Sequence, residues 1–307
     1  MPPNPTRRCL LAGLAASALP PASAAESPVA VGSKIDLEGG LLGQMMLISL
    51  AEAGIPAVNK LQLGPTPILR AALLSGAIDL CPEYTGNAAF FFHEDGDPLW
   101  KDAAAGFARA AKLDFEQNGV IWLTPAPANN SWVIAVPEAL AEMQNLRTMV
   151  DFGRFVRDGH AVKLAASAEF VESRAGLPAF EAAYGFRLSA RQLLVLSGGE
   201  TSATMKAAAD GISGVNAAMA YATDGGLKAL GLRALEDTLH AEPVYAPAPV
   251  IRAMALANYP QIRGILGRVF SKLTLAALRE LNEKVAVEGA EPSAVAREFI
   301  RAQGFSR

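Results

Sequence analysis

Four aromatic side chains with polar tips stand beside turn-forming residues at widely separated places in the chain. They are Tyr84, Trp132, Tyr221 and Tyr245. The face of an aromatic ring attracts a cation by ~0.5–2 kcal/mol, so four rings around one cleft would hold a quaternary ammonium group. Each ring could instead be a half-buried packing residue whose polar tip reaches water. The residue types therefore allow two interpretations, a cation cage or scattered packing aromatics.

The residues that catalysis or metal binding would need are scarce. The chain of 307 residues contains 3 His and 2 Cys, which leaves little material for a zinc site or a disulfide framework. It has no G-x-S-x-G, no phosphate-binding P-loop and no H-E-x-x-H motif. We therefore expect no catalytic residue, no metal and no cofactor. A formal charge of −3 also provides no basic excess for binding nucleic acid.

Short apolar runs alternate with longer segments of helical spacing, and this alternation is typical of an α/β fold. The pattern predicts strands near residues 29–31, 58–63, 78–80, 120–123, 132–136, 162–166, 193–196 and 217–221. It predicts helices near residues 41–53, 66–75, 100–118, 149–157, 178–184, 202–210, 276–289 and 293–303. Ligands of such folds bind beyond the carboxyl ends of the strands. Tyr84 and Tyr221 each stand near such an end, so the aromatic residues could converge on one cleft, although packing is the simpler interpretation of each residue taken alone.

Two segments rich in Pro and Ala, residues 124–130 and 244–250, bracket the middle of the chain. Proline fixes φ and biases the residue before it toward extended backbone, so both segments are predicted to be extended. The chain could leave a first lobe through one segment and return through the other, a layout that suits hinged closure around a ligand. Lobe 1 would then comprise residues 25–129 and 247–307, and lobe 2 residues 130–246. Two ordinary proline-rich loops are the alternative.

The first residues have the pattern of an export signal. Arg7 and Arg8 precede an apolar run at residues 9–19, and residues 22–24 form a small-residue cleavage site. The apolar run is too short to span a bilayer. We therefore expect residues 1–24 to be a signal peptide cleaved near Ala24 and the mature protein to be periplasmic. The paired arginines fit either general secretion or the twin-arginine route.

Several short motifs occur in one order along the chain. They are Ser33-Lys34 with Glu38, Pro82 to Gly86, Asn129 to Trp132, Ala168 to Phe170, Ala183 to Phe186, Tyr221 to Gly225 and Tyr245 to Val250. In this order they resemble the substrate-binding proteins of osmoprotectant (glycine betaine/choline) ABC importers, in particular the OsmF/YehZ-type branch, over residues 28–305. The resemblance implies the type II periplasmic-binding-protein fold, in which two α/β lobes are joined by two extended crossovers.

The resemblance also implies a ligand site. Its residues here would be Lys34, Tyr84, Asn87, Asn130, Trp132, Arg174, Tyr221 and Tyr245. The four aromatic residues would surround a trimethylammonium group, while Lys34 and Arg174 would hold a carboxylate from the first and second lobe. A buried carboxylate needs charge-assisted hydrogen bonds, and Arg can supply two in parallel. Surface ion pairs with Asp36 for Lys34 and with Glu172 for Arg174 are the alternative.

Three positions depart from the pattern of the resembling proteins. Relatives commonly have Thr where Asn87 stands and Tyr where Trp132 stands. Asn130 falls where some relatives have an acidic residue. Asn87 and Asn130 would add polar contacts to the ligand, and Trp132 would keep a ring face for the cation. These departures affect affinity and ligand identity, so the exact methylated amine is left open.

These observations predict a binding protein that captures glycine betaine or a related quaternary-ammonium zwitterion. It would deliver the ligand, unchanged, to the permease and ATPase subunits of an ABC importer, and it would act as a monomer. An exported enzyme acting on a small zwitterion is one alternative. A transporter module for another solute, such as an amino acid, is a second.

Overall fold

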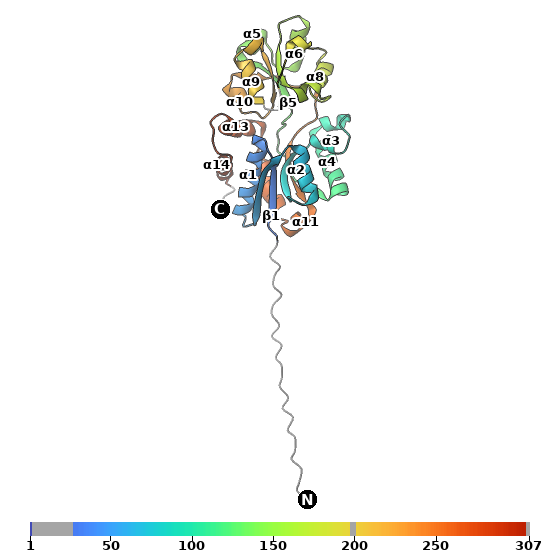
Figure 1. Cartoon of the computed structure of the whole chain (residues 1–307), viewed down its shortest axis with the longest axis vertical. Helices are drawn as coiled ribbons and strands as arrows, with labels where there is room; N and C mark the ends of the chain where they lie inside the picture. The colour runs from blue at the N-terminus through green and yellow to red at the C-terminus, as the bar shows by residue number, and fades with distance from the viewer. Residues whose placement is uncertain (2–26, 197–200, 305–307) are drawn as a thin grey trace.

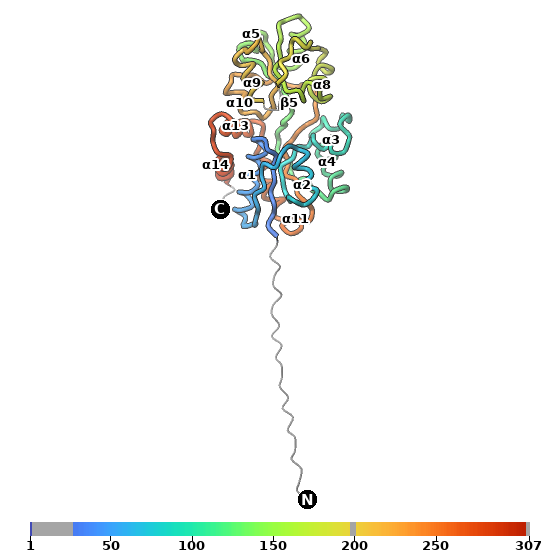
Figure 2. Tube along the Cα trace, viewed as in Figure 1, coloured from blue at the N-terminus to red at the C-terminus, as the bar shows by residue number. Residues whose placement is uncertain are grey.

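The computed structural model describes residue 1, residues 27–196 and residues 201–304. Residues 27–196 and 201–304 form two lobes stacked along the long axis of the molecule (Figure 1). The colours of the upper lobe run from green to orange, whereas the lower lobe carries both the blue and the red parts of the chain (Figure 2). The lower lobe is therefore built from both ends of the described chain. Apart from Met1, the expected signal peptide and its cleavage site lie outside the described residues.

The lower lobe contains a five-stranded sheet in the order β2-β1-β3-β10-β4. Its strands are β1 (Val29–Lys34), β2 (Ala57–Gly64), β3 (Leu80–Tyr84), β4 (Val120–Trp122) and β10 (Pro247–Arg252). Strand β1 pairs in parallel with β2 and β3, whereas β10 is antiparallel to both β3 and β4. The strand that returns from the other lobe thus enters between two strands of the first pass.

Helices cover both faces of this sheet and bury a core on each side. On one face lie α1 (Leu37–Glu52), α11 (Ala253–Asn258), α12 (Ile262–Phe270), α13 (Leu275–Ala286) and α14 (Pro292–Ala302). On the other face lie α2 (Thr66–Ser75), α3 (Asn87–Phe91) and α4 (Ala103–Asn118). Helix α1 begins where the carboxylate of Asp36 accepts a hydrogen bond from the Gly39 amide, which caps its first turn.

The upper lobe repeats the arrangement with a sheet in the order β7-β6-β8-β5-β9. Its strands are β5 (Trp132–Pro137), β6 (Leu164–Ser167), β7 (Leu193–Leu196), β8 (Ala217–Tyr221) and β9 (Leu232–Ala234). One face carries α5 (Glu138–Gln144), α6 (Met149–Arg157), α7 (Ala168–Glu172) and α8 (Leu177–Tyr184). The other face carries α9 (Thr201–Ala209) and α10 (Gly226–Ala229). Here β5, which follows the first crossover, is the antiparallel strand.

The second proline-rich segment is only partly a crossover, because its later half is strand β10 in the interior of the sheet. Proline lacks an N–H and is normally confined to edge strands or bulges. Here the carbonyl oxygens of Pro247 and Pro249 accept hydrogen bonds from the amides of Ala126 and Leu123. The two prolines therefore contribute carbonyl acceptors to the sheet, and the sheet tolerates their missing N–H groups.

Two element boundaries differ from the sequence-based prediction. Strand β3 runs from Leu80 to Tyr84, so Tyr84 is the last residue of the strand rather than part of the following turn. The helix expected from Trp100 begins as a short 3-10 turn, and α4 starts only at Ala103. The carboxylate of Asp102 accepts a hydrogen bond from the Ala105 amide and so fixes this start. No helix in the described part of the chain is long and apolar enough to cross a membrane.

The side chain of Asp114 is fully buried in the lower lobe and ties three elements together. Its oxygens accept hydrogen bonds from Arg70 of α2 at 2.6 and 2.8 Å, and from the indole of Trp122 at 2.8 Å. Removing one partner of a buried ion pair leaves the other charge uncompensated, which costs about 3–5 kcal/mol. We expect Asp114→Ala to lower the free energy of unfolding by that amount in urea titrations.

The matched control is Asp210→Ala, because Asp210 pairs with Lys206 at 2.7 Å on the surface of α9. Exposed pairs of this kind contribute less than about 1 kcal/mol. Equal losses of stability in the two variants would contradict the role given to burial.

Candidate functional site

The two crossover segments lie side by side between the lobes. The backbone N–H of Asn130 donates to the carbonyl oxygen of Tyr245 at 2.9 Å, and the N–H of Tyr245 donates to Asn129 Oδ1 at 2.8 Å. The end of β3 joins them, because the Thr85 amide donates to the Ala246 carbonyl at 3.1 Å. Residues distant in sequence are thereby brought to one level of the molecule, at the carboxyl end of β3.

Tyr84 and Tyr245 occupy the side of this junction that belongs to the lower lobe. The Tyr84 side chain is buried, and its hydroxyl donates to Glu38 Oε1 at 2.8 Å. The Tyr245 ring packs on Gly86, where a Cβ atom would stand only 2.7 Å from ring carbons. Any larger residue at position 86 would displace the ring. The glycine of the Tyr-Thr-Gly turn is thus required by this close approach.

Trp132 and Tyr221 form the corresponding pair in the upper lobe. They are direct neighbours across β5 and β8, and their rings stack with centroids 6.4 Å apart. The edge of Phe170 from α7 meets Trp132 with a centroid distance of 5.5 Å. Burial raises the pKa of Tyr221 to about 12, although the neighbouring Trp132 indole lowers it. Burial also raises the pKa of Tyr245, and the charge of Glu242 adds to this shift.

Lys34 lies buried beneath this junction and already has partners. Its ammonium is 2.9 Å from Glu83 Oε1 and 4.5 Å from the centroid of the Tyr84 ring. Asn87 Nδ2 donates to the same Glu83 oxygen at 2.7 Å. The ion pair considered for Lys34 was with Asp36 on the surface, but the structure pairs it with Glu83 in the interior. The Tyr84 ring therefore faces the ammonium of Lys34.

Asn130 connects the lobes through its amide. Its Nδ2 donates to Glu38 Oε1 at 3.1 Å, and its Oδ1 accepts from the Thr223 hydroxyl at 2.7 Å. Asn282 of α13 donates to Glu38 Oε2 at 2.7 Å. Burial raises the pKa of Glu38, whereas the hydrogen bonds from Tyr84 and Asn282 lower it. A buried carboxylate surrounded by donors thus stands at the centre of the predicted residues.

Arg174 is the predicted residue that the structure leaves apart. It is exposed, and the described residues offer it no hydrogen bond or ion pair, including the one considered with Glu172. It follows α7, the helix whose Phe170 touches Trp132. The other predicted residues form two sets: Lys34, Tyr84, Asn87, Asn130 and Tyr245 are linked through the contacts above, and Trp132 and Tyr221 stack on each other in the upper lobe.

Several residues of the site were not predicted as ligand or site residues. They are Glu38, Glu83, Phe170, Thr223, Glu242 and Asn282. Glu38, Glu83, Phe170 and Thr223 lie within the ordered motifs. Glu38 stands in the first turn of α1, where acidic residues are common, so its residue type did not indicate its contacts. Glu242 is buried, accepts from the Trp132 amide at 3.1 Å, and has its pKa raised well above normal by burial. Asn282 offered no sequence signal at all.

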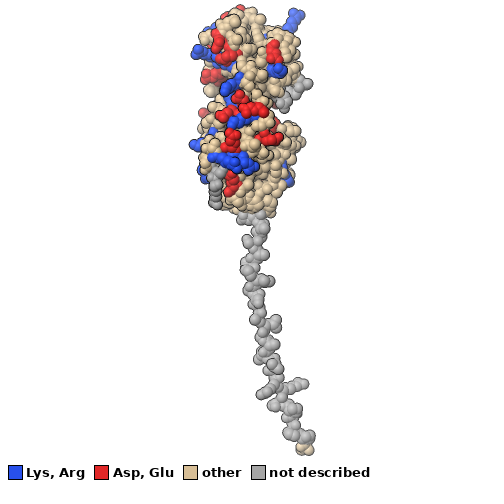
Figure 3. Space-filling model, turned by 90° about the vertical axis from the view of Figure 1, so that its left-hand side faces the viewer, with Lys and Arg blue, Asp and Glu red and all other residues tan. Residues whose placement is uncertain are grey.

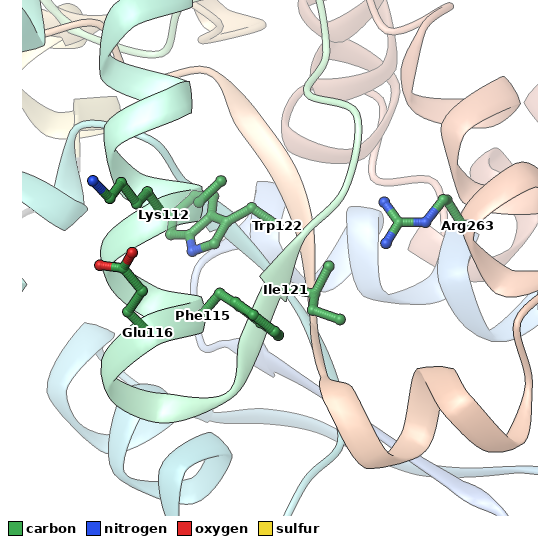
Figure 4. Close-up of a pocket in the computed structure, with 7 residues that line it drawn as sticks. Lys112, Phe115, Glu116, Ile121, Trp122 and Arg263 are labelled. Carbon is green, nitrogen blue, oxygen red and sulfur yellow. The ribbon is translucent and has the colours of Figure 1, made fainter.

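Two grooves lie away from this junction. One, of about 710 Å³, separates β9 and α10 from α13, and its charged lining comprises Glu138, Asp224, Lys228, Arg233, Arg279, Glu280 and Glu283. Basic and acidic side chains stand close together where the lobes meet on one face of the molecule (Figure 3). The other groove, of about 490 Å³, lies on the lower lobe between α4, β4 and Arg263 of α12 (Figure 4). Neither groove contains a predicted ligand residue.

Within residues 27–196 and 201–304, no three His, Cys, Asp or Glu side chains are placed to hold a metal ion.

Known proteins match this chain over nearly its whole length. Residues 27–302 match the family described as the substrate binding domain of ABC-type glycine betaine transport systems. The chain is 52% identical over 294 residues to the glycine betaine-binding protein YehZ of Escherichia coli strain K12, covering 96% of each chain. It is 29% identical over 277 residues to a glycine-betaine-binding protein of Pseudomonas aeruginosa, covering 88% of this chain and 86% of that one.

The fold agrees with these matches. The structure of apo YehZ from Escherichia coli aligns with a TM-score of 0.80 and 52% identity, covering 91% of this chain and 100% of the other. Both the expected family and the expected type II periplasmic-binding-protein fold are confirmed. The chain belongs to the substrate-binding domain family of ABC-type glycine betaine transport systems.

Proposed function

We propose that this protein captures glycine betaine or a related quaternary-ammonium zwitterion between its lobes and delivers it, unchanged, to an ABC permease and its ATPase. The observation that supports the proposal is the position of four aromatic residues beside the joined crossovers: Tyr84 at the end of β3, Tyr245 against Gly86, and the stacked Trp132–Tyr221 pair of β5 and β8. A trimethylammonium group has no N–H to donate, so hydrogen bonding cannot select it. Ring faces, apolar contact and shape can.

Acidic side chains around the junction support a positively charged ligand head. Glu38 and Glu83 are buried on the side of the lower lobe, and the buried Glu242 accepts from the Trp132 amide. These carboxylates compensate for the neutral Asn130 at a position where some relatives are acidic. The ammonium of Lys34 over Tyr84 shows that this ring face can serve a cation.

The carboxylate of a zwitterion needs cationic partners, and Lys34 and Arg174 are the proposed ones. An ammonium has three N–H donors, so Lys34 can bind Glu83 and still donate to a ligand. The guanidinium of Arg174, which is exposed and pairs with none of the described residues, would contact the ligand carboxylate from the upper lobe. Contacts from both lobes would make the ligand bind the closed arrangement better, and this difference drives closure. Asn87 and Asn130 would supply polar contacts at the rim of the box.

The remaining parts of the proposal concern the protein as a whole. Lobe 1 comprises residues 25–129 and 247–307 and lobe 2 residues 130–246, with opening and closing about the two crossovers. The protein is exported to the periplasm after cleavage near Ala24, acts as a monomer and has no catalytic activity. Calorimetry with glycine betaine and choline, followed by NMR of the released ligand, tests both binding and the absence of conversion. A binding protein returns the ligand intact, whereas an enzyme would convert it.

Trp132 should report ligand binding by fluorescence. We expect glycine betaine or choline to change the tryptophan emission of the wild type. Trp132→Phe keeps a ring face, so calorimetric affinity should stay within roughly fivefold while the emission change disappears. Trp122→Phe is the control, because Trp122 is buried in the lower lobe against Asp114. An emission change that survives in Trp132→Phe would place the ligand elsewhere.

Ring faces, rather than bulk, should determine the affinity for the cation. Replacing Tyr221 or Tyr245 with Leu should weaken choline about 2- to 30-fold, the equivalent of ~0.5–2 kcal/mol. Phe at either position should retain most of the affinity. The uncharged tert-butyl isostere of choline should lose less affinity than choline in the Leu variants. Equal losses for the two compounds, measured by calorimetry, would reject the cage.

The two proposed carboxylate contacts should distinguish glycine betaine from choline. Arg174→Ala should weaken glycine betaine about 10- to 100-fold, because a hydrogen bond to a charged group contributes ~1.5–3 kcal/mol. Choline carries no carboxylate and should be unaffected by this change. Arg191, an exposed arginine beside β7, provides the control substitution Arg191→Ala. A loss of both ligands, or of neither, would remove Arg174 from the site.

A further inference from the structure

We propose that Glu38 is a positioning residue whose carboxylate joins the two lobes and fixes Tyr84 and Asn130 for ligand binding. The part of this proposal that concerns the ligand rests on the function proposed above, and the part that concerns the lobes does not. The role proposed for Glu38 differs from that of a ligand contact, because its carboxylate binds side chains of the protein. Its action is exerted through the residues that it holds.

The carboxylate of Glu38 accepts from three side chains of three separate segments. Tyr84 of β3 and Asn130 of the first crossover donate to Oε1, at 2.8 and 3.1 Å. Asn282 of α13 donates to Oε2 at 2.7 Å. All three partners are donors, and an ionised carboxylate is an acceptor only. The arrangement therefore suits a carboxylate specifically and would be satisfied by neither an amide nor a hydroxyl.

These partners extend from Glu38 to the upper lobe. The same Asn282 Nδ2 also donates to the carbonyl oxygen of Thr223 at 2.9 Å, in the turn after β8. The Thr223 hydroxyl donates to Asn130 Oδ1 at 2.7 Å. Glu38, Asn130, Thr223 and Asn282 thus form a closed ring of contacts that includes both lobes. Each member is oriented by the next, so the loss of one loosens the others.

Helix α13 packs directly on the turn that Thr223 belongs to. Arg279 Nε donates to the Ala222 carbonyl oxygen at 2.7 Å. A Cβ atom at Gly225 would collide with the backbone of Glu283, so the turn and the helix are in contact without intervening side chains. The link between Asn282 and Thr223 is therefore part of a tight surface between lobes. Glu38 is the residue that connects this surface to the aromatic box through Tyr84.

The matched pair of variants is Glu38→Gln and Glu83→Gln. Gln at position 38 keeps the shape but replaces one acceptor oxygen with an NH₂ group that faces a donor. Glu83 is equally buried, yet its partners Lys34, Asn87 and the Tyr84 amide all belong to the lower lobe. The proposal therefore predicts that only the change at position 38 alters the relation of the lobes.

The first experiment measures the distance between the lobes without ligand. Spin labels on cysteines at exposed Phe115 of α4 and Val150 of α6 report it by pulsed electron spin resonance. Cys81 is buried in β3 and should not be labelled. We expect a broader and longer distance distribution in Glu38→Gln than in the wild type or Glu83→Gln. Asn282→Ala should reproduce the effect, and it serves if Glu38→Gln does not fold by circular dichroism.

The second experiment measures calorimetric affinity for glycine betaine and choline. We expect Glu38→Gln to weaken both by about tenfold or more, since it acts on the arrangement that both ligands require. Wild-type lobe distances in both Glu38→Gln and Asn282→Ala would overturn the proposal. If the wild type binds no quaternary amine, the proposed function fails, while the lobe distances still decide the role of Glu38.

Discussion

The hydrogen bonds between the two crossover segments are the constraint on which the site depends. Asn130 donates to the Tyr245 carbonyl, and Tyr245 donates to the Asn129 side chain. Without them the segments before β5 and β10 could separate, and their aromatic residues would have no fixed relation. Each segment then continues as an antiparallel strand in the fourth position of its sheet. The same two contacts therefore hold together the segments that lead into β5 and β10.

Burial of charge gives this junction its chemical character. Carboxylates at Glu38, Glu83 and Glu242 are removed from water, which is costly unless donors or cations compensate. Glu83 has Lys34 and Asn87, and Glu38 has three side-chain donors, whereas Glu242 Oε1 has no hydrogen-bond partner among the residues that the structure describes. Ring faces attract a positive group whether or not it carries N–H donors, so the aromatic residues beside these carboxylates are the groups suited to a quaternary ammonium head.

Much of the fold could be predicted because its signals are local. The alternation of apolar runs predicted β5, β7 and β8 closely, since a buried strand needs continuous apolar residues. The start of α2 at Thr66–Pro67 was predicted from Thr as a cap followed by Pro, but Thr66 is the first helical residue and the N-cap is Pro65, which makes no side-chain hydrogen bond. Short helices such as α3, α7 and α10 were not predicted, because their few residues carry no periodic pattern. Strand β10 was not predicted because Pro247 and Pro249 indicate an edge or a loop.

The site could be predicted only as far as its motifs reach. The aromatic residues stand beside recognisable turns, and the structure links them at the crossovers. The role of Glu38 depends on Asn282, a residue 244 positions away, and no local pattern announces such a contact. The partner of Lys34 was also unpredictable, because Asp36 is nearer in sequence while Glu83 is nearer in space. Long-range pairing of polar groups is decided by the packed fold rather than by spacing.

A crystal structure of the protein grown with glycine betaine tests the central claim most directly. The account predicts electron density for the trimethylammonium group among the rings of Tyr84, Trp132, Tyr221 and Tyr245, with the ligand carboxylate toward Lys34 and Arg174. Density for the ligand in another part of the molecule, with these rings in contact only with protein, would contradict it.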